Sequence, residues 1–226
     1  MTRIGIPITN KPNMATDERR IPQSVIKRLT AYLTRVQILR ASNVKWVSSQ
    51  EMAKALDLTS STVRQDLSHL DYYGIAKRGY ETVRLEASIS AVLGADKVWN
   101  IMVIGAGNLG RALVKHEEFG KRGFHIRAIL DSDARKVGKR VGVLKIESTG
   151  NLARIVRRER IDMAIIAVPA GAAQDTADIL IKTGVKGILN MTLAHIIVPN
   201  DIIVVEMRIV SSLRELSYRM LLNTSK

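Results

Sequence analysis

The sequence predicts an α/β protein of two domains, a winged helix-turn-helix followed by a doubly wound parallel sheet of the Rossmann type. Helical patterns with a polar-faced third helix fill the first part of the chain, and apolar strands alternate with helices from Trp99 onward. Such alternation is typical of a parallel sheet with helices on both faces. We expect a flexible tail over residues 1–20, a DNA-binding domain over 21–94, a dinucleotide-binding domain over 95–209 and a C-terminal dimerisation helix over 210–226.

The composition is ordinary for a globular protein, with 46% hydrophobic and 25% charged residues among 226. No apolar stretch reaches the roughly 18 residues that cross a bilayer, and the first residues lack the apolar segment of a secretion signal. We therefore expect a cytoplasmic protein without a membrane partner. The absence of cysteine and the scattered positions of the four histidines argue against disulfides and against a metal site.

The net charge of +14 favours an anionic partner, of which nucleic acid is the commonest. Residues 1–94 carry 14 Lys and Arg against 8 Asp and Glu, and residues 95–226 carry 21 against 13. Because both parts are basic, charge alone does not locate the nucleic-acid site. The motifs must do so.

Three helices are expected in the first domain. Apolar residues at spacings of three and four follow Pro22, which suits a first helical turn. Ser48 and Glu51 form a capping box that opens a second helix. A third helix is predicted over residues 61–73, ending at Gly74. The residues expected to face the core are Val25, Ile26, Leu29, Leu33, Val36, Leu39, Met52, Ala53, Leu56, Val63, Leu67 and Leu70.

The outer face of the third helix carries hydrogen-bonding side chains. Arginine pairs with guanine and glutamine with adenine in the major groove, so Arg64 and Gln65 are predicted to contact bases. The arrangement is typical of a helix-turn-helix whose third helix enters the major groove; a small helical domain without this role is the alternative. The DNA-binding residues expected on this helix are Ser61, Thr62, Arg64, Gln65 and Ser68.

Two short apolar segments around a basic turn, residues 75–85, predict a hairpin that forms a wing. Lys77 and Arg78 at its tip would meet phosphates or a narrowed minor groove. Tyr80 would insert or hydrogen-bond there, or else simply cover the small sheet.

A glycine turn lies between the apolar run that ends at Ile104 and the helix that follows it. Gly105 permits a tight turn, Gly107 allows a pyrophosphate to approach the backbone, and Gly110 allows the helix to pack closely on the sheet. Asp131 ends the next apolar run, where its carboxylate would accept hydrogen bonds from an adenosine ribose and repel a 2′-phosphate. This favours NAD over NADP. The cofactor-binding residues predicted here are Gly105, Ala106, Gly107, Asn108, Leu109, Gly110, Asp131 and Ser132.

A basic run follows Asp131 and leaves an alternative open, since it could hold the phosphate of NADP or coenzyme A, or lie in a solvated loop. Its members are Arg135, Lys136, Lys139 and Arg140, of which Lys136 is included in the predicted site.

Further strands are predicted over residues 141–146, 162–168, 187–191 and 202–207, with helices over 149–160 and 170–184. Val168, Pro169, Ala170 and Asn190 fall at strand ends, where open α/β sheets bind ligands. A last helix, 211–222, has an apolar stripe of Leu213, Leu216 and Met220 that needs a partner surface.

These residues together resemble the redox-sensing transcriptional repressor Rex family, over almost everything from residue 21 onward. The matching stretches are Lys27-Arg28-Leu29 to Tyr32-Leu33, Val47-Ser48-Ser49, Thr62 to Asp66, Lys77 to Tyr80, Gly105 to Arg111, Leu130 to Asp133, Val168 to Gln174 and Gly187 to Asn190. The resemblance implies a homodimer whose final helix is exchanged between subunits, binding to operator DNA, and release when NADH replaces NAD. It implies NAD and NADH as cofactors and no catalytic residues.

Three departures from the family pattern bear on the redox response. His116 stands where the family usually has a tyrosine, and residues 190–193 read Asn-Met-Thr-Leu in place of NFTP. Met207-Arg208-Ile209 replaces VDL, so the family's carboxylate, which the resemblance pairs with Arg28 in one state, becomes an arginine that would repel Arg28.

Two other functions compete with a repressor. An NAD(P)-dependent oxidoreductase needs a substrate pocket and a proton-transfer group, and after the first domain the chain has barely one Rossmann unit and no obvious histidine–acid pair. We therefore predict that the chain is not an enzyme. A regulator that senses coenzyme A or another adenosine-containing ligand remains the second alternative.

Overall fold

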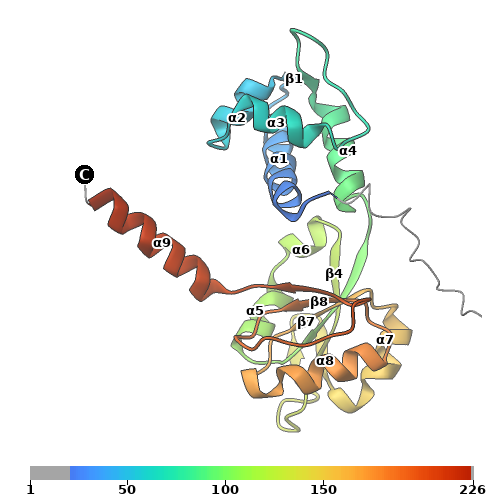
Figure 1. The fold of residues 1–226 in the computed structure, drawn as a ribbon. Helices are drawn as coiled ribbons and strands as arrows, with labels where there is room; N and C mark the ends of the chain where they lie inside the picture. The colour runs from blue at the N-terminus through green and yellow to red at the C-terminus, as the bar shows by residue number, and fades with distance from the viewer. Residues whose placement is uncertain (1–20, 225–226) are drawn as a thin grey trace, which may run out of the picture. The chain divides into compact units, whose positions relative to one another are not determined.

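The computed structural model describes residues 21–224 and divides into two compact units at Asp96 and Lys97 (Figure 1). The predicted tail, residues 1–20, lies outside the described residues.

In the described part of the first unit, four helices pack around one core. α1, Gln23–Ala41, follows Pro22 and buries Val25, Leu29, Tyr32, Leu33 and Val36. α2, Ser49–Ala55, opens with the predicted capping box, in which Ser48 Oγ accepts from the Glu51 N–H at 3.1 Å and Glu51 accepts from the Ser48 N–H at 2.7 Å. α3, Ser60–Leu67, is capped by Thr59.

The third helix is shorter than predicted, since it ends at Leu67 rather than near Tyr73. Ser68 donates its hydroxyl to the Gln65 carbonyl, a local bond that competes with helical pairing. The Tyr72 hydroxyl then accepts from the Glu81 N–H at 3.0 Å, so the chain is directed towards the small sheet. Leu70 is buried as predicted, although it lies outside the helix.

The predicted wing hairpin over residues 75–85 is also corrected. Ile75 and Gly79 form a single antiparallel bridge around a tight turn, and β2, Tyr80–Glu81, pairs instead with β1, Trp46–Val47. The segment expected to be the second arm is already helix α4, Thr82–Leu93, which buries Leu85 and Ile89 in the core.

The second unit contains one seven-stranded sheet in the order β5-β6-β4-β3-β7-β8-β9. All neighbours are parallel except β5 and β6, which form an antiparallel hairpin around Gly142 where one strand over 141–146 was predicted. The strands are β3 Trp99–Ile104, β4 Phe124–Asp131, β5 Arg140–Val141, β6 Leu144–Ser148, β7 Met163–Ile166, β8 Gly187–Asn190 and β9 Ile203–Glu206.

Helices cover both faces of this sheet, which confirms the doubly wound prediction. Because side chains alternate along a strand, Met102 and Ile104 of β3 enter one core, and Ile101 and Val103 enter the other. α7 and α8 contribute to the first core and α5 to the second. The helices are α5 Asn108–Lys115, α6 Glu118–Lys121, α7 Leu152–Glu159 and α8 Ala173–Lys182, with the short 3₁₀ segments η2 Thr149–Asn151 and η3 Ala170–Ala172.

The last helix, α9, spans Ile209–Thr224 (Figure 1). Every side chain from 209 to 223 is exposed, including the apolar Leu213 at 56% and Leu216 at 53%. No helix in the part of the chain that the structure describes has the length and apolar character needed to span a membrane.

Candidate functional site

The glycine turn has the geometry that its sequence predicts. Gly105 adopts a φ of +105°, and a Cβ there would lie 2.3 Å from the carbonyl oxygen of Ala167. A Cβ on Gly110 would lie 1.9 Å from the carbonyl oxygen of Gly105, so α5 approaches the turn as only glycine allows. A Cβ on Gly107 would meet nothing within 4 Å. The turn therefore presents an open backbone position to a cavity.

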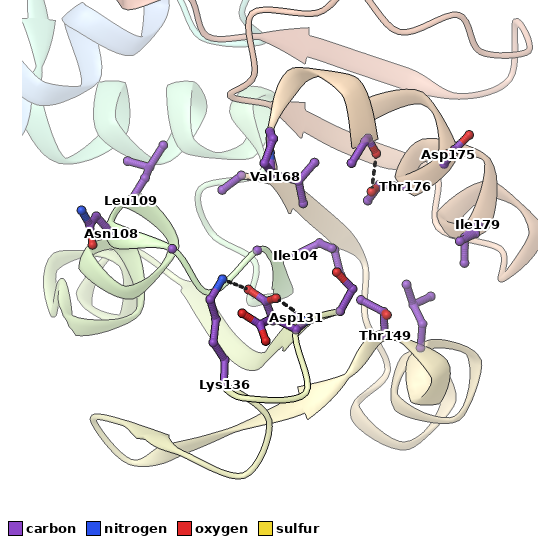
Figure 2. A pocket seen from close by; sticks show the side chains of 18 residues that line it. Ile104, Asn108, Leu109, Asp131, Lys136, Thr149, Val168, Asp175, Thr176 and Ile179 are labelled. Carbon is purple, nitrogen blue, oxygen red and sulfur yellow. Dashed lines mark hydrogen bonds and ion pairs between the residues drawn. The ribbon is translucent and has the colours of Figure 1, made fainter.

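A cavity of 590 Å³ lies at the carboxyl ends of the strands (Figure 2). Its lining joins the glycine turn to the tip of β4, to the start of η2 and to the segment between β7 and α8. The predicted residues that line it are Gly105, Gly107, Asn108, Leu109, Asp131, Ser132, Lys136, Val168 and Pro169.

Four predicted residues do not line this cavity. Ala106 is buried, Gly110 packs against the turn, and Ala170 opens η3 beside the cavity. Asn190 was expected at the ligand but is completely buried, where its amide donates to the Ala194 carbonyl and its oxygen accepts from Thr192. Asn190 therefore holds the loop after β8 in place.

Several lining residues were missed by the sequence analysis. Thr149 follows directly after β6, and Asp175 and Thr176 lie in the first turn of α8. A signal existed for Thr149, since it follows the carboxyl end of a parallel strand, where ligands bind. The other missed members are Ile104, Asp133, Leu152, Ala167, Ala172 and Ile179.

Asp131 is buried at the tip of β4 and is surrounded by donors. One carboxylate oxygen accepts from the Ala106 N–H at 2.8 Å and from the Lys136 ammonium at 3.0 Å, and the other accepts from the Asp133 N–H at 2.8 Å. Burial would raise the pKa of Asp131, but these three donors outweigh it and hold the pKa below its usual value. The carboxylate is therefore ionised at neutral pH, with one oxygen still able to accept a further donor.

This arrangement suits an adenosine diphosphate group. The N-terminal N–H groups of α5 and its dipole favour a diphosphate, and Gly107 leaves room for one. Asp131 can accept a ribose hydroxyl, while Leu152 and Ile179 supply apolar wall for a flat ring. No cluster of metal-ligating side chains occurs among residues 21–224.

The predicted DNA-binding face lies on α3. Ser61, Arg64, Gln65 and Ser68 are exposed, and Thr62 is half-buried with its hydroxyl 2.8 Å from that of Thr59. A hollow of 530 Å³ separates this face from the turn that follows it; its lining includes Ser49, Gln50, Arg64, Lys77 and Tyr80.

The opposite face of α3 is fixed by a residue that the sequence analysis did not single out. Asp66 is buried and accepts two hydrogen bonds from the Arg28 guanidinium, at 2.6 and 2.7 Å, and one from the Tyr32 hydroxyl at 2.7 Å. Burial would raise the pKa of Asp66, but the bonds from Arg28 and Tyr32 lower it below its usual value. α3 is thus held to α1 by a charge pair, which fixes the position of the helix that carries the exposed side chains.

Two side chains of the basic turn have aromatic partners within the first unit. The Arg78 guanidinium lies over the ring of Trp46, 4.0 Å from its centroid, and Trp46 was not among the predicted residues. The Tyr80 ring packs edge-on against Tyr72, with centroids 6.3 Å apart, and burial raises its pKa. Tyr80 therefore covers the small sheet.

Comparison with known proteins covers both units. Residues 20–68 match a family described as putative DNA-binding protein N-terminus, and residues 96–194 match the CoA binding domain. The redox-sensing transcriptional repressor Rex of Caldicellulosiruptor bescii is 36% identical over 203 residues, which are 90% of this chain and 94% of that protein. This chain belongs to the redox-sensing transcriptional repressor Rex family. The predicted family is therefore confirmed.

Solved Rex structures share the fold over nearly the whole chain. RSP in complex with β-NAD⁺ and operator DNA has a TM-score of 0.85 at 33% identity, covering 89% of this chain and 93% of RSP. RSP with β-NADH has a TM-score of 0.82 at 32% identity, covering 91% of this chain and 99% of RSP. These matches confirm the fold class of a DNA-binding domain followed by a Rossmann domain. The relatives are named transcriptional repressors, in agreement with the prediction that the chain is not an enzyme.

Two of the three departures from the Rex pattern, His116 and Arg208, have identifiable partners in the structure. His116 ends α5, with its ring 5.3 Å from that of Phe119. Arg208 pairs with Glu206 at 2.7 Å, and His195 lies 2.9 Å from the same carboxylate. Arg28, which the family pattern would pair with a carboxylate at position 208, is bound by Asp66 within its own unit, at 2.6 Å.

Proposed function

We propose that this protein is a transcriptional repressor that binds operator DNA as a homodimer and leaves it when the ratio of NADH to NAD rises. The main support for this proposal is that one chain has both a cavity suited to an adenosine diphosphate and a recognition helix that is held in place and exposes its polar side chains. Membership of the Rex family supports the same conclusion. Such a regulator acts in the cytoplasm, where DNA and the NAD pool meet.

The cofactor proposed for the cavity is NAD or NADH. A 2′-phosphate would meet the ionised, buried Asp131, whereas a ribose hydroxyl could donate to it. Gly107, Asn108 and the following N–H groups would hold the diphosphate. Val168 and Pro169 would contact the rest of the dinucleotide from the β7 side.

On the DNA-binding face, some residues are proposed to contact bases and others to contact the phosphate backbone of the DNA. Arg64 and Gln65 are exposed on α3 and would contact base edges in the major groove. Lys77, in the turn across the hollow, would hold phosphate. Thr62 and Ser68 use their hydroxyls within the protein and would add only secondary contacts.

The homodimer is proposed from two exposed apolar surfaces. α9 exposes its apolar stripe, and the edge strand β9 exposes Ile203 at 69% and Val205 at 59%. Ile203 and Val205 border an apolar groove of 400 Å³, which is also lined by Phe119 of α6 and by Ile165 and Leu189 of the sheet. Surfaces of this kind mark protein interfaces. A second copy, with its α9 exchanged, would cover both.

Dimer geometry would carry the signal to DNA. Two recognition helices occupy successive major grooves only when they lie roughly 34 Å apart, so a change in separation abolishes specific binding. An apolar interface between the subunits would bind the neutral reduced nicotinamide more tightly than the oxidised cation, because burying an unpaired charge is costly. This difference in affinity would shift the dimer between two states.

The test begins with duplexes selected by the wild-type protein from a randomised pool. Binding of the selected palindromic duplex is then titrated with NAD, NADH, NADPH and coenzyme A. We expect NADH to release the DNA, NAD to leave it bound, and NADPH to act only at much higher concentration. Release by coenzyme A alone would support the second candidate, which the CoA binding domain match favours. Turnover of NADH with a panel of carbonyl substrates would contradict a purely regulatory role.

A further inference from the structure

The turn after α3 directs its two basic side chains to different surroundings. Lys77, in the left-handed region with a φ of +63°, lines the hollow beside Arg64. Arg78 lies over Trp46 of β1, with its guanidinium carbon 4.0 Å from the ring centroid. Two adjacent cations thus have separate roles in the structure.

The position of Arg78 is fixed by backbone packing on both sides. The Gly79 N–H donates to the Ile75 carbonyl at 2.9 Å, and the Ile75 N–H donates back at 2.7 Å. A Cβ on Gly79, whose φ is +88°, would lie 2.4 Å from the carbonyl oxygen of Val47. The turn therefore packs directly against β1, and the half-buried Trp46 provides the surface on which Arg78 rests.

The stacked guanidinium keeps its charge and its donors available. Arg78 is exposed, and the neighbouring carboxylate in β2, that of Glu81, pairs with Arg84 at 3.1 Å. Stacking uses the face of the guanidinium and leaves its N–H groups in the plane free. An arginine already held in one conformation loses less side-chain entropy on binding.

We propose that Trp46 is a positioning residue that holds Arg78 for insertion into a narrow, A·T-rich minor groove beside the base-contacted half-site. This inference rests on the proposed operator binding. A narrow minor groove has enhanced negative potential and attracts arginine, so sequence is sensed without a base contact. Lys77, which lacks a stacking partner and faces the hollow, holds phosphate and carries no such preference.

The test compares two duplexes that share the selected half-sites and differ only in flanks of A·T or G·C pairs. We expect the wild type to prefer the A·T flanks, because their narrow minor groove attracts arginine. Loss of the stacking contact, which is worth about two- to fivefold at an exposed site, should remove that preference. Trp46→Leu and Arg78→Lys should lose this preference, the second while keeping its charge. Trp46→Phe should keep most of it. Lys77→Ala is the matched control, which should weaken both duplexes equally.

A double-mutant cycle separates positioning from packing. In an Arg78→Ala background, Trp46→Leu should cost no further affinity, since its effect passes through Arg78. Thermal unfolding and NADH binding check that each variant is folded; if Trp46→Leu is not, Arg78→Lys still decides the outcome. The inference would be overturned if Arg78→Lys still preferred the A·T flanks. It would also be overturned if the affinity losses of Trp46→Leu and Arg78→Ala were additive in the double mutant. Wild-type binding that ignored NADH would instead overturn the proposed function.

Discussion

The ammonium of Lys136 lies 3.0 Å from a carboxylate oxygen of Asp131, inside the cavity where a dinucleotide ribose is proposed to bind (Figure 2). The carboxylate repels a 2′-phosphate and the ammonium attracts one, so the two side chains have opposing effects on cofactor choice. Their balance should decide how strictly the protein distinguishes NADH from NADPH.

Asp131→Ala should therefore lower NADH affinity about ten- to hundredfold, because hydrogen bonds to charged groups contribute about 1.5–3 kcal/mol, and should raise NADPH affinity. Lys136→Met should weaken NADPH and leave NADH nearly unchanged. Calorimetric titration of both variants with both cofactors measures these changes. Unchanged NADH affinity in Asp131→Ala, without a gain for NADPH, would remove this residue from the ribose site.

Gly107 and Gly110 provide a matched pair for testing the glycine turn. Gly110→Ala should destabilise the Rossmann unit, because its Cβ would lie 1.9 Å from the Gly105 carbonyl oxygen. Gly107→Ala should leave thermal stability unchanged, since its Cβ meets nothing, yet should weaken NADH binding by blocking the approach of the diphosphate. Equal NADH affinity of wild type and a folded Gly107→Ala would contradict the placement of the diphosphate.

The glycine turn, Asp131 and the capping box were predictable because each depends on a few neighbouring residues. The other side of the cavity was harder to predict. Thr149 follows the carboxyl end of a strand, which is a signal, but the strand order β6-β4-β3-β7 is what brings it and Thr176 to the same cavity as the glycine turn. A single sequence contains the strands but not their order. Pairing of Tyr80 with Val47 is likewise non-local, and it displaced the predicted hairpin.

The end of the third helix shows a different limit. Apolar residues at helical spacing continue to Leu70, and Leu70 is indeed buried, so the pattern was correct about burial and wrong about conformation. Tertiary contacts of Tyr72 with Glu81 determine the path of the chain there. Trp46 was overlooked for a similar reason, since its partner Arg78 is adjacent only in the folded unit.

Arg64 and Lys77 should affect DNA binding in distinguishable ways. Arg64→Ala should relax the preference at one position of each half-site and cost about 1–3 kcal/mol, because it removes a base contact. Lys77→Ala should weaken all duplexes alike and reduce the dependence of affinity on salt. Binding across single-base operator variants at two salt concentrations checks both. If Lys77→Ala changed the sequence preference and Arg64→Ala weakened all duplexes alike, Lys77 would be the base contact and Arg64 the phosphate contact.

The Arg28–Asp66 pair predicts a pH-dependent contribution to stability. The pKa of Asp66 is lowered in the folded protein, so the pair stabilises the fold above the carboxyl's ordinary pKa and ceases to do so as the pH falls through the lowered value. Arg28→Met should cost about 3 kcal/mol at pH 7, the low end for a broken buried pair, because the arginine side chain is 32% exposed. The difference from wild type should shrink below about pH 4. Urea unfolding of wild type and Arg28→Met at pH 7 and below about pH 4 measures this difference in the free energy of unfolding. A difference that does not change with pH would show that the loss comes from packing and not from the charge pair.

The exposed stripe of α9 predicts that dimerisation and operator binding are lost together. Removal of residues 211–226 should give a monomer that no longer binds the operator, because two recognition helices are no longer held one helical turn apart. Its Rossmann unit should still bind adenine nucleotides, since the cavity residues all precede the deletion. Leu216→Glu should have the same effect, because Leu216 belongs to the apolar stripe, whereas Ser211→Glu places the same charge on the opposite side of the helix and should leave the dimer intact. Sedimentation together with DNA titration distinguishes these outcomes. A truncated chain that stayed dimeric and kept NADH-sensitive operator binding would show that the signal passes between subunits by another route.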